Sequence, residues 1–324
     1  MLKFYAVDDE TLRVTDSSGG SIVSENPIWF DLHNPTPDER DTVAAAVDAP
    51  VPTRDEMEEI EVSSRLRDED GVLYLTATVI SGADTSDVSS SAITFMLVNH
   101  RLVTIRYEDP KPFVVVADRL ARLHAASLTG ESILMTLLDA VIDRLADVLE
   151  RQGTNIETIS QDIFHYDSEG KPESHDFDDL IRRIGQAGDM TARVRESLVS
   201  IARLLLYVIN NPQIRGKHVG RERFKTLHRD VTSLADHATF LANKTNFLLD
   251  ATLGMINIEQ TGIIKIFSVA AVVLLPPTVI ASIYGMNFEV MPELDWDFGY
   301  PFALLLMVVS AVLPYLWFKR KGWL

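Results

Sequence analysis

An amide and two carboxylates lie in a short segment between two long apolar runs near the carboxyl end of the chain. The segment reads YGMNFEVMPEL over residues 284–294 and contains Asn287, Glu289 and Glu293. An asparagine oxygen can accept hydrogen bonds from the waters around a cation, and nearby carboxylates raise the local cation concentration. Gly285 lets the backbone leave a helix at this point. The segment therefore indicates contact with a hydrated cation; the alternative is a polar turn without a ligand.

The two flanking runs have the length of membrane spans. Residues 266–284 and 300–318 carry no charged side chain over nineteen residues each, and a helix needs about 20 apolar residues to cross a bilayer core. Two such runs in tandem argue against two buried helices of a soluble core. The basic residues 319–321 follow directly, which predicts that this end is cytoplasmic. Residues 1–260 then lie on the same side, and the loop 285–299 is external.

The net charge belongs almost entirely to the part before the spans. The formal net charge of the 324 residues is −17, and residues 261–324 contain four bases and four acids, which cancel. An acidic region of this kind repels nucleic acid and concentrates cations, although acidity also serves solubility alone. Cysteine is absent, which excludes disulfides and thiolate metal sites. The sequence contains no catalytic or nucleotide-binding motif, so we expect neither an enzyme nor a bound cofactor.

The region before the spans divides by pattern into two parts. Residues 1–125 are predicted to form a mixed α+β domain. Its strands are expected at 28–32, 71–80, 92–98 and 102–107, with helices at 37–47 and 53–60. Residues 126–220 are predicted to form an antiparallel helical hairpin, because apolar residues recur at spacings of three and four. In its second helix these are Ile184, Ala187, Val194, Leu198, Ile201, Leu205 and Val208.

A long helix is predicted from residue 221 to residue 284, so the chain is mostly helical overall. No proline occurs from residue 221 until Pro276, and about 60 residues of helix extend roughly 90–100 Å. This stalk helix would continue directly into the first span, at about residues 263–284. The second span covers 300–318, followed by a basic tail at 319–324.

One face of the stalk helix carries small and polar residues across the membrane boundary, while the adjacent face is mostly apolar. The positions are Asp250, Gly254, Asn257, Thr261, Ile264, Ser268, Ala271, Leu275, Thr278 and Ser282. Polar groups in a bilayer are costly unless they face protein or water. The stripe is therefore either a close helix–helix interface or the wall of a water-filled pore that Ile264 and Leu275 gate by dewetting. Because one helix cannot surround a pore, the second interpretation requires a symmetric oligomer.

The loop and both spans together resemble one family. YGMNFEVMPELDWDFGYP is similar to the signature loop of the CorA family of magnesium transporters, with its GMN tripeptide followed by MPEL. The similarity extends back through MINIEQTGIIKIFSVAAVVLLPPTVIASIYGMN and forward to FKRKGWL. It covers roughly the last 75 residues strongly. The region before it matches the family in layout.

The resemblance implies a homopentameric channel of a bacterial-type inner membrane. Such a channel passes hydrated Mg2+, and in some relatives Co2+ or Ni2+, down the electrochemical gradient. Acidic sites that bind intracellular Mg2+ close it, and the sequence does not locate them. The implied fold is an α/β/α sandwich funnel, a stalk helix and two transmembrane helices. Mg2+ is then substrate and regulator rather than cofactor, and the partners are the bilayer, divalent cations and further copies of the chain, without nucleic acid.

The resemblance also assigns roles to residues. Gly285, Met286 and Asn287 would form the selectivity filter, with hydrated Mg2+ at Asn287, and the family's pore face falls on the stripe defined above. Some relatives have Met at the constrictions where this chain has Ile264 and Leu275, and these branched residues are expected to form a dry gate. The inner entrance often has Asn where this chain has Thr261.

Two other functions are compatible with parts of the sequence. One is zinc transport, as in another branch of the same superfamily, but the intact MPEL segment with its two glutamates favours magnesium. The other is a membrane-anchored cytoplasmic sensor or enzyme. An anchor has no need of a polar stripe, and no catalytic constellation accompanies it.

Overall fold

The computed structural model describes residues 1–8, 11–16, 27–85, 88–122, 128–164, 177–212, 218–287, 291–292 and 296–322. The chain forms two compact units, Met1–Leu248 and Leu249–Leu324. The first unit contains all described strands, and the second contains the two apolar helical segments.

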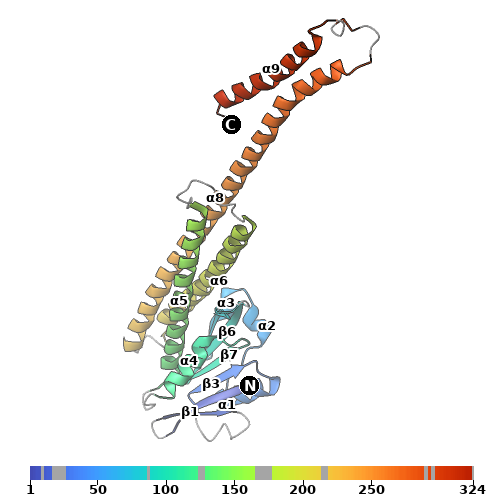
Figure 1. Ribbon diagram of the computed structural model, residues 1–324. Coiled ribbons are helices and arrows are strands. Elements are labelled where there is room, and N and C mark those ends of the chain that lie inside the picture. Colours follow the sequence, from blue (N-terminus) through green and yellow to red (C-terminus); the bar gives the residue numbers. More distant parts are fainter. Residues whose placement is uncertain are drawn as a thin grey trace. The chain divides into compact units, whose positions relative to one another are not determined.

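The centre of the first unit is a sheet of seven strands among the described residues (Figure 1). In spatial order these are β2 (Thr11–Asp16), β1 (Leu2–Asp8), β3 (Trp29–His33), β7 (Arg101–Arg106), β6 (Ser89–Val98), β5 (Val72–Ser81) and β4 (Leu66–Glu69). Strands β3 and β7 are parallel, and the other pairs are antiparallel. The four predicted strands are confirmed. β1, β2 and β4 were not predicted; β4 reads LRDE and takes its conformation from pairing with β5.

Helices cover both faces of this sheet. On one face α1 (Pro37–Val47) and α2 (Arg54–Glu58) enclose a core that includes Phe30, Met57 and Met96. On the other face α4 (Lys111–Leu120) places Phe113 against Phe95, with ring centroids 6.3 Å apart. The expected α/β/α sandwich is therefore confirmed. A short helix, α3 (Val62–Arg65), follows α2 within the segment predicted as one helix.

Local sequence explains how α1 and α2 begin. Thr36 and Thr53 are N-caps, and each accepts a hydrogen bond from the backbone N–H three residues later. The side-chain carboxylates of Glu39 and Glu56 in turn accept hydrogen bonds from the backbone N–H groups of Thr36 and Thr53, which completes two capping boxes. Burial alone would raise the pKa of Glu39, but the hydrogen bonds from Thr36 and the N-terminal ammonium outweigh it, so that pKa is lowered.

A tight turn links β6 to β7 and also contacts the start of a helix further along the chain. Asn99 and His100 have positive φ angles of 46° and 64°, as in the mirror-image turns that suit twisted hairpins. Helix α5 (Gly130–Phe164) begins where the Gly130 N–H donates to the His100 carbonyl oxygen at 2.6 Å. A Cβ at Gly130 would lie 2.5 Å from the backbone carbon of Arg101, so glycine alone fits.

Two further helices and the first part of a third complete the described residues of the first unit. The predicted hairpin is present as α5 and α6 (Phe177–Asn210), and the seven predicted core residues of α6 are buried (Figure 1). The third helix is α8 (His218–Tyr284). Leu241 of α8 approaches Gly153 of α5, and Thr245 of α8 approaches Gly188 of α6. The single long helix predicted from residue 221 is confirmed and begins three residues earlier.

Two charge clusters hold elements of the first unit together. Asp31 on β3 receives bonds from Arg106 on β7 at 2.9 and 3.1 Å and from the Thr104 hydroxyl at 2.8 Å, and all three residues are buried. Burial alone would lower the pKa of Arg106, but bonds to Asp31 and Asp109 outweigh it and raise that pKa. This pair could not be predicted from the sequence, because its members are 75 residues apart.

The second cluster lies on the surface of the same unit. Asp84, after β5, accepts hydrogen bonds from Arg144, Lys111 and Arg151. These three bonds hold the pKa of the Asp84 carboxyl well below its usual range. The cluster ties the β5–β6 connection to α4 and α5.

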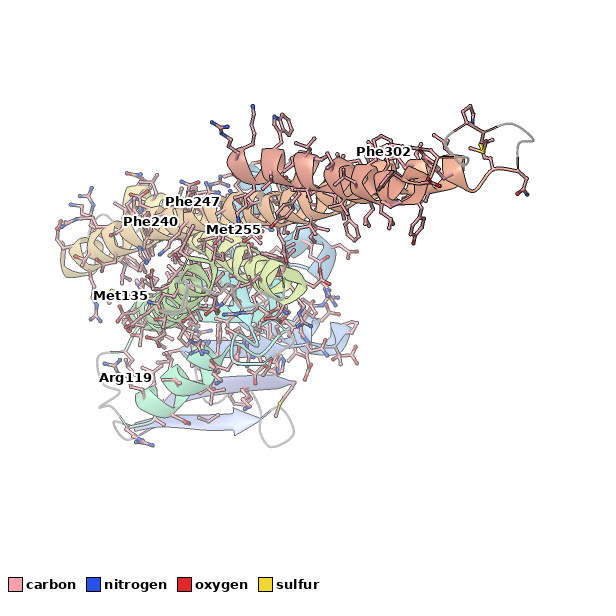
Figure 2. The ribbon with its side chains drawn as sticks, turned by 45° about the horizontal axis from the view of Figure 1, so that its top comes forward. Arg119, Met135, Phe240, Phe247, Met255 and Phe302 are labelled. Carbon is pink, nitrogen blue, oxygen red and sulfur yellow. The ribbon has the colours of Figure 1, made fainter. Side chains whose placement is uncertain are left out.

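The second unit contains residues 249–284 of α8 and helix α9 (Gly299–Arg320). Both helices are long and apolar enough to cross a membrane, as the sequence predicted. Helix α9 runs back alongside the last part of α8 (Figures 1 and 2). Val269 on α8 and Ala303 and Phe318 on α9 are the buried apolar residues among those described in this unit.

Candidate ion pathway

The ten stripe residues predicted from the sequence all lie on α8. Nine of them are exposed, and Ser268 is half-buried. Residues spaced three and four apart share one face of a helix, so the structure places these side chains in a continuous row along α8.

The opposite face of α8 is more covered. In the second unit its less exposed residues include Gly262, Val269, Val273, Pro276 and Ile280. At about 100° per residue these positions point roughly away from the stripe. Most of α8 in this unit is exposed, and the stripe lies within the exposed part, away from these less exposed residues. Glu259, Gln260 and Lys265 are exposed polar residues outside the stripe.

Hydroxyl groups on the stripe are oriented by the helix backbone. The Thr261 hydroxyl donates to the Asn257 carbonyl oxygen at 2.7 Å, and the Ser282 hydroxyl donates to the Thr278 carbonyl oxygen at 2.8 Å. Thr278 donates in the same way to Leu274. Because each hydroxyl proton is used within the helix, the oxygen lone pairs remain as acceptors. Waters bound to a cation point their hydrogens outward, so such acceptors suit a hydrated cation.

Two branched residues interrupt the polar row. The side chains of Ile264 and Leu275 are 64% and 63% exposed. They are eleven positions apart, which corresponds to about 16 Å along the helix. If copies of α8 surround an axis, these residues form two apolar rings.

The GMN segment follows the last turn of α8. The helix closes with bonds from the Gly285 N–H to the Ala281 carbonyl oxygen, 2.9 Å, and from the Met286 N–H to the Ile283 carbonyl oxygen, 3.2 Å. The Asn287 side chain is exposed, and none of the described residues bonds to it. Its amide oxygen is thus available to a ligand. Glu289 and Glu293 lie outside the described residues.

Aromatic side chains mark both ends of α9. Trp296 precedes the helix, and its ring centroid lies 5.8 Å from that of Phe302. Trp317 lies in the last turn, with the Lys321 Nζ 5.6 Å from its ring centroid. About 21 residues separate the two tryptophans, or roughly 30 Å of helix, which matches a bilayer core. Interfacial tryptophans and lysines are typical of a spanning helix.

The sequence analysis did not predict a set of exposed apolar residues that α8 carries outside the stripe. Phe240 and Phe247 are each 59% exposed (Figure 2), and Ile258 is 70% exposed. Phe247 stacks on Phe164 with centroids 6.1 Å apart. The seven-residue spacing of Phe240 and Phe247 was visible in the sequence, but the faces of α8 that α5 and α6 cover were not.

No group of three or more His, Asp or Glu among the described residues is arranged to hold a metal.

Comparison with known proteins gives one consistent family. The model of the family described as CorA-like Mg2+ transporter protein matches residues 24–320. The chain is 34% identical to "Magnesium transport protein CorA" of Haemophilus ducreyi, with all of both chains covered. It is 38% and 36% identical to proteins of the same name from Pectobacterium atrosepticum and Escherichia coli, with 92% of each chain covered.

The fold is also similar to a solved structure. "The complete structure of CorA magnesium transporter from Methanocaldococcus jannaschii" superposes with a TM-score of 0.80 at 18% identity, covering 100% of this chain and 99% of that one. The full-length CmaX protein gives a TM-score of 0.70 at 15% identity. At these identities the likeness concerns the fold alone.

Proposed function

Because the chain belongs to the CorA-like Mg2+ transporter family, we propose that it is a homo-oligomeric channel that passes hydrated Mg2+ across a membrane. The relatives that it matches over nearly their full length are named magnesium transport proteins. Co2+ and Ni2+ are further candidate ions. The proposal includes the division predicted above into an α/β domain to residue 125, a helical hairpin to residue 220 and the stalk helix beyond.

One observation carries this proposal: the polar stripe of α8 is left open on the side opposite the more covered face. In a bilayer these polar groups need protein or water beside them. A ring of identical helices around an axis provides both, with α9 as an outer layer. Thr261, Thr278 and Ser282 keep hydroxyl lone pairs that can accept hydrogen bonds from water in such a pore.

Asn287 is proposed as the selectivity filter, with Gly285 and Met286 shaping its loop. Mg2+ loses its waters reluctantly, so a filter that contacts the hydrated ion is easier to enter than one that strips it. Neutral amide oxygens accept hydrogen bonds from those waters and bind the ion less tightly than carboxylates would. Glu289 and Glu293 would concentrate cations at the outer mouth.

Ile264 and Leu275 are proposed as the gate, since apolar rings can close a pore by dewetting. Asp250 and Thr261 would line the inner entrance. The membrane potential drives entry, with about 2.3 kcal/mol per elementary charge per 100 mV. Intracellular Mg2+ would close the channel by binding acidic sites of the cytoplasmic domain.

The assembly is proposed to be a pentamer in a bacterial-type inner membrane, with both termini cytoplasmic. The basic residues 319–321 support this orientation. The exposed apolar side chains Phe240, Phe247 and Ile258 support close contact between copies, because large apolar patches are rarely left to solvent.

Divalent-cation flux into liposomes that contain the purified chain tests the proposal. Asn287→Ala should abolish Mg2+ uptake while light scattering shows an unchanged oligomer, because only the filter oxygens are removed. The matched control is Asp297→Asn, an exposed residue beyond the GMN segment, which should keep most of the flux.

Two results would contradict the assignment. Mg2+ uptake that survives Asn287→Ala would remove Asn287 from the filter. Zn2+ flux without Mg2+ flux in the unaltered chain would move the protein to zinc transport.

A further inference from the structure

A cavity of about 570 Å3 opens beside α6 in the first unit, among residues that have no part in the proposed ion pathway. Strand β5 continues past the end of β4, so Thr78, which pairs with Ala92 of β6 on one side, has no strand partner among the described residues on the other side. Helix α6 covers this edge. The Ser197 hydroxyl donates to the Thr78 carbonyl oxygen at 2.7 Å, and the Thr78 N–H donates to the Ser200 hydroxyl oxygen at 3.0 Å. The cavity volume is in the range of small-molecule sites.

The charge of the cavity wall is opposite to that of the chain. Arg65, Arg195 and Arg203 line it, with Glu196 as the one acidic residue, so the lining carries a net charge of +2 in a chain of −17. Arg195 and Arg203 have no ion pair or hydrogen bond among the described residues. They are eight residues apart on one face of α6, or about 12 Å along the helix. Two unpaired guanidinium groups at one wall are suited to an anion.

Two further donors are held in place at the wall. The Arg65 guanidinium donates through Nε to the Glu59 carbonyl oxygen at 2.7 Å and through Nη1 to the Thr78 hydroxyl at 3.2 Å. These bonds fix the plane of the group and leave Nη2 available. The Ser200 hydroxyl accepts from Thr78, and its own proton has no acceptor in the part of the chain that is described. Donors therefore outnumber acceptors around the cavity.

The remaining wall is apolar. Ile60 and Val62 are 91% and 51% exposed, and Leu66 and Val199 complete this side. A purely inorganic anion would leave it uncovered, whereas a ligand with a flat apolar part would cover it.

A second cavity, of about 250 Å3, adjoins the first. It shares Arg65, Thr78 and Glu196 with the larger one, but Arg54, Glu58 and Glu108 also line it, so two bases face three acids and its lining carries a net charge of −1. Ser90 and Ser91 also line it, and their buried hydroxyl oxygens have no partner among the described residues. Buried polar atoms without a partner indicate a missing water or ligand.

We propose that the larger cavity binds an organic phosphate of nucleotide size, with its phosphate on Arg65, Arg195 and Arg203 and its ring against Ile60 and Val62. The inference goes beyond ion transport and concerns binding alone.

Isothermal titration of the full-length chain in detergent, with a chelator and no divalent cation, tests this binding. AMP should bind saturably and more tightly than inorganic phosphate. Arg195→Gln and Arg203→Gln should each weaken AMP binding about tenfold, because each removes one charged hydrogen-bonding group. Ile60→Ser should weaken AMP binding several-fold and leave phosphate binding unchanged, because it removes only apolar contact.

Arg193→Gln is the matched control. Arg193 lies on the same helix, pairs with Asp189 at 2.8 Å and does not line either cavity. It should bind AMP as the unaltered chain does. Absence of AMP binding, or equal affinities of the Arg193→Gln and Arg195→Gln chains, would overturn the proposal. Inorganic phosphate binding as tightly as AMP would overturn the role of the apolar wall.

Discussion

The two units differ in which side chains they bury and which they expose. In Met1–Leu248 the large apolar residues are mostly buried, and charged groups such as Asp31 and Asp84 are paired. In Leu249–Leu324 most of the large apolar side chains are exposed, and the polar ones form an uncovered row on α8. Only Val269, Ala303 and Phe318 are buried apolar residues among those described there.

This inversion shows that the two units are adapted to different solvents. An apolar surface of that size would aggregate in water, but it is the favourable surface in lipid. The polar row would be costly in lipid and requires water or another copy of the chain. The same residue type should therefore have different effects when it is changed in one unit or in the other.

The largest expected effect is in the first unit, at its buried ion pair. Asp31→Ala should lower the free energy of unfolding of this unit by about 3–5 kcal/mol, because it leaves the Arg106 charge buried with one partner fewer. Hydrogen exchange of amides in β3 and β7 of the full chain measures this loss. Glu58→Ala is the control, since it breaks the exposed pair Arg54–Glu58 and should cost about 0.5 kcal/mol or less. Equal losses would mean that burial does not govern the ion pairs of this unit.

Substituting aspartate for an exposed apolar residue should have a large effect in the second unit and a small one in the first. Val308, near the middle of α9, is 58% exposed, and Ile60 is 91% exposed. Val308→Asp should make membrane insertion about 3 kcal/mol less favourable, whereas Ile60→Asp should alter stability by about 0.5 kcal/mol or less. Alkaline extraction of membranes after expression gives the inserted fraction. Full insertion of the Val308→Asp chain would break the contrast between the units.

A smaller effect, on the melting temperature, is expected from substitution of Asp84, and it depends on pH. The pKa of Asp84 is lowered in the folded chain by bonds from Arg144, Lys111 and Arg151. A lowered carboxyl pKa contributes stability that is present above the ordinary value of 3.8 and is lost as the pH falls toward the folded value. Asp84→Asn should therefore lower the melting temperature at about pH 6 and differ less from the unaltered chain at about pH 3. A difference that does not change with pH would exclude this linkage.

The smallest expected effect is an increase in stability, on substitution of Asp143. Burial, followed by the nearby charges of Asp139 and Asp147, raises the pKa of Asp143 on α5. A raised carboxyl pKa gives stability that is complete below the ordinary value and lost as the pH rises through the folded value. Asp143→Asn should thus raise the melting temperature slightly at neutral pH, and added Mg2+ should reduce that gain by screening the carboxylates. Destabilisation at neutral pH would show that the charge of Asp143 has a favourable partner.

Patterns that repeat along the chain were the most predictable features. The apolar spacing of α6, the length of α8 and the two candidate spans follow from side-chain periodicity, which depends only on neighbouring residues. The family resemblance through the GMN loop is confirmed by the family match. The roles of Asn287, the stripe and the two loop glutamates remain predictions.

Features that join distant residues could not be predicted. Strand β4 is mostly charged and pairs only because β5 lies beside it. Asp31 and Arg106 meet because β3 and β7 are parallel neighbours. Arg195 and Arg203 resemble ordinary surface residues of a helix until α3 and β5 form the other walls of their cavity.

The sequence by itself determined the family, the candidate membrane spans and the face of α8 that carries polar groups, because periodicity and loop chemistry are local. The tertiary structure decided which charges are buried in pairs, which face of α8 stays open in its own unit and where α6 and the sheet edge enclose a basic cavity. Those properties depend on which distant segments pack together, since burial and pairing are set by neighbours in space rather than by neighbours along the chain.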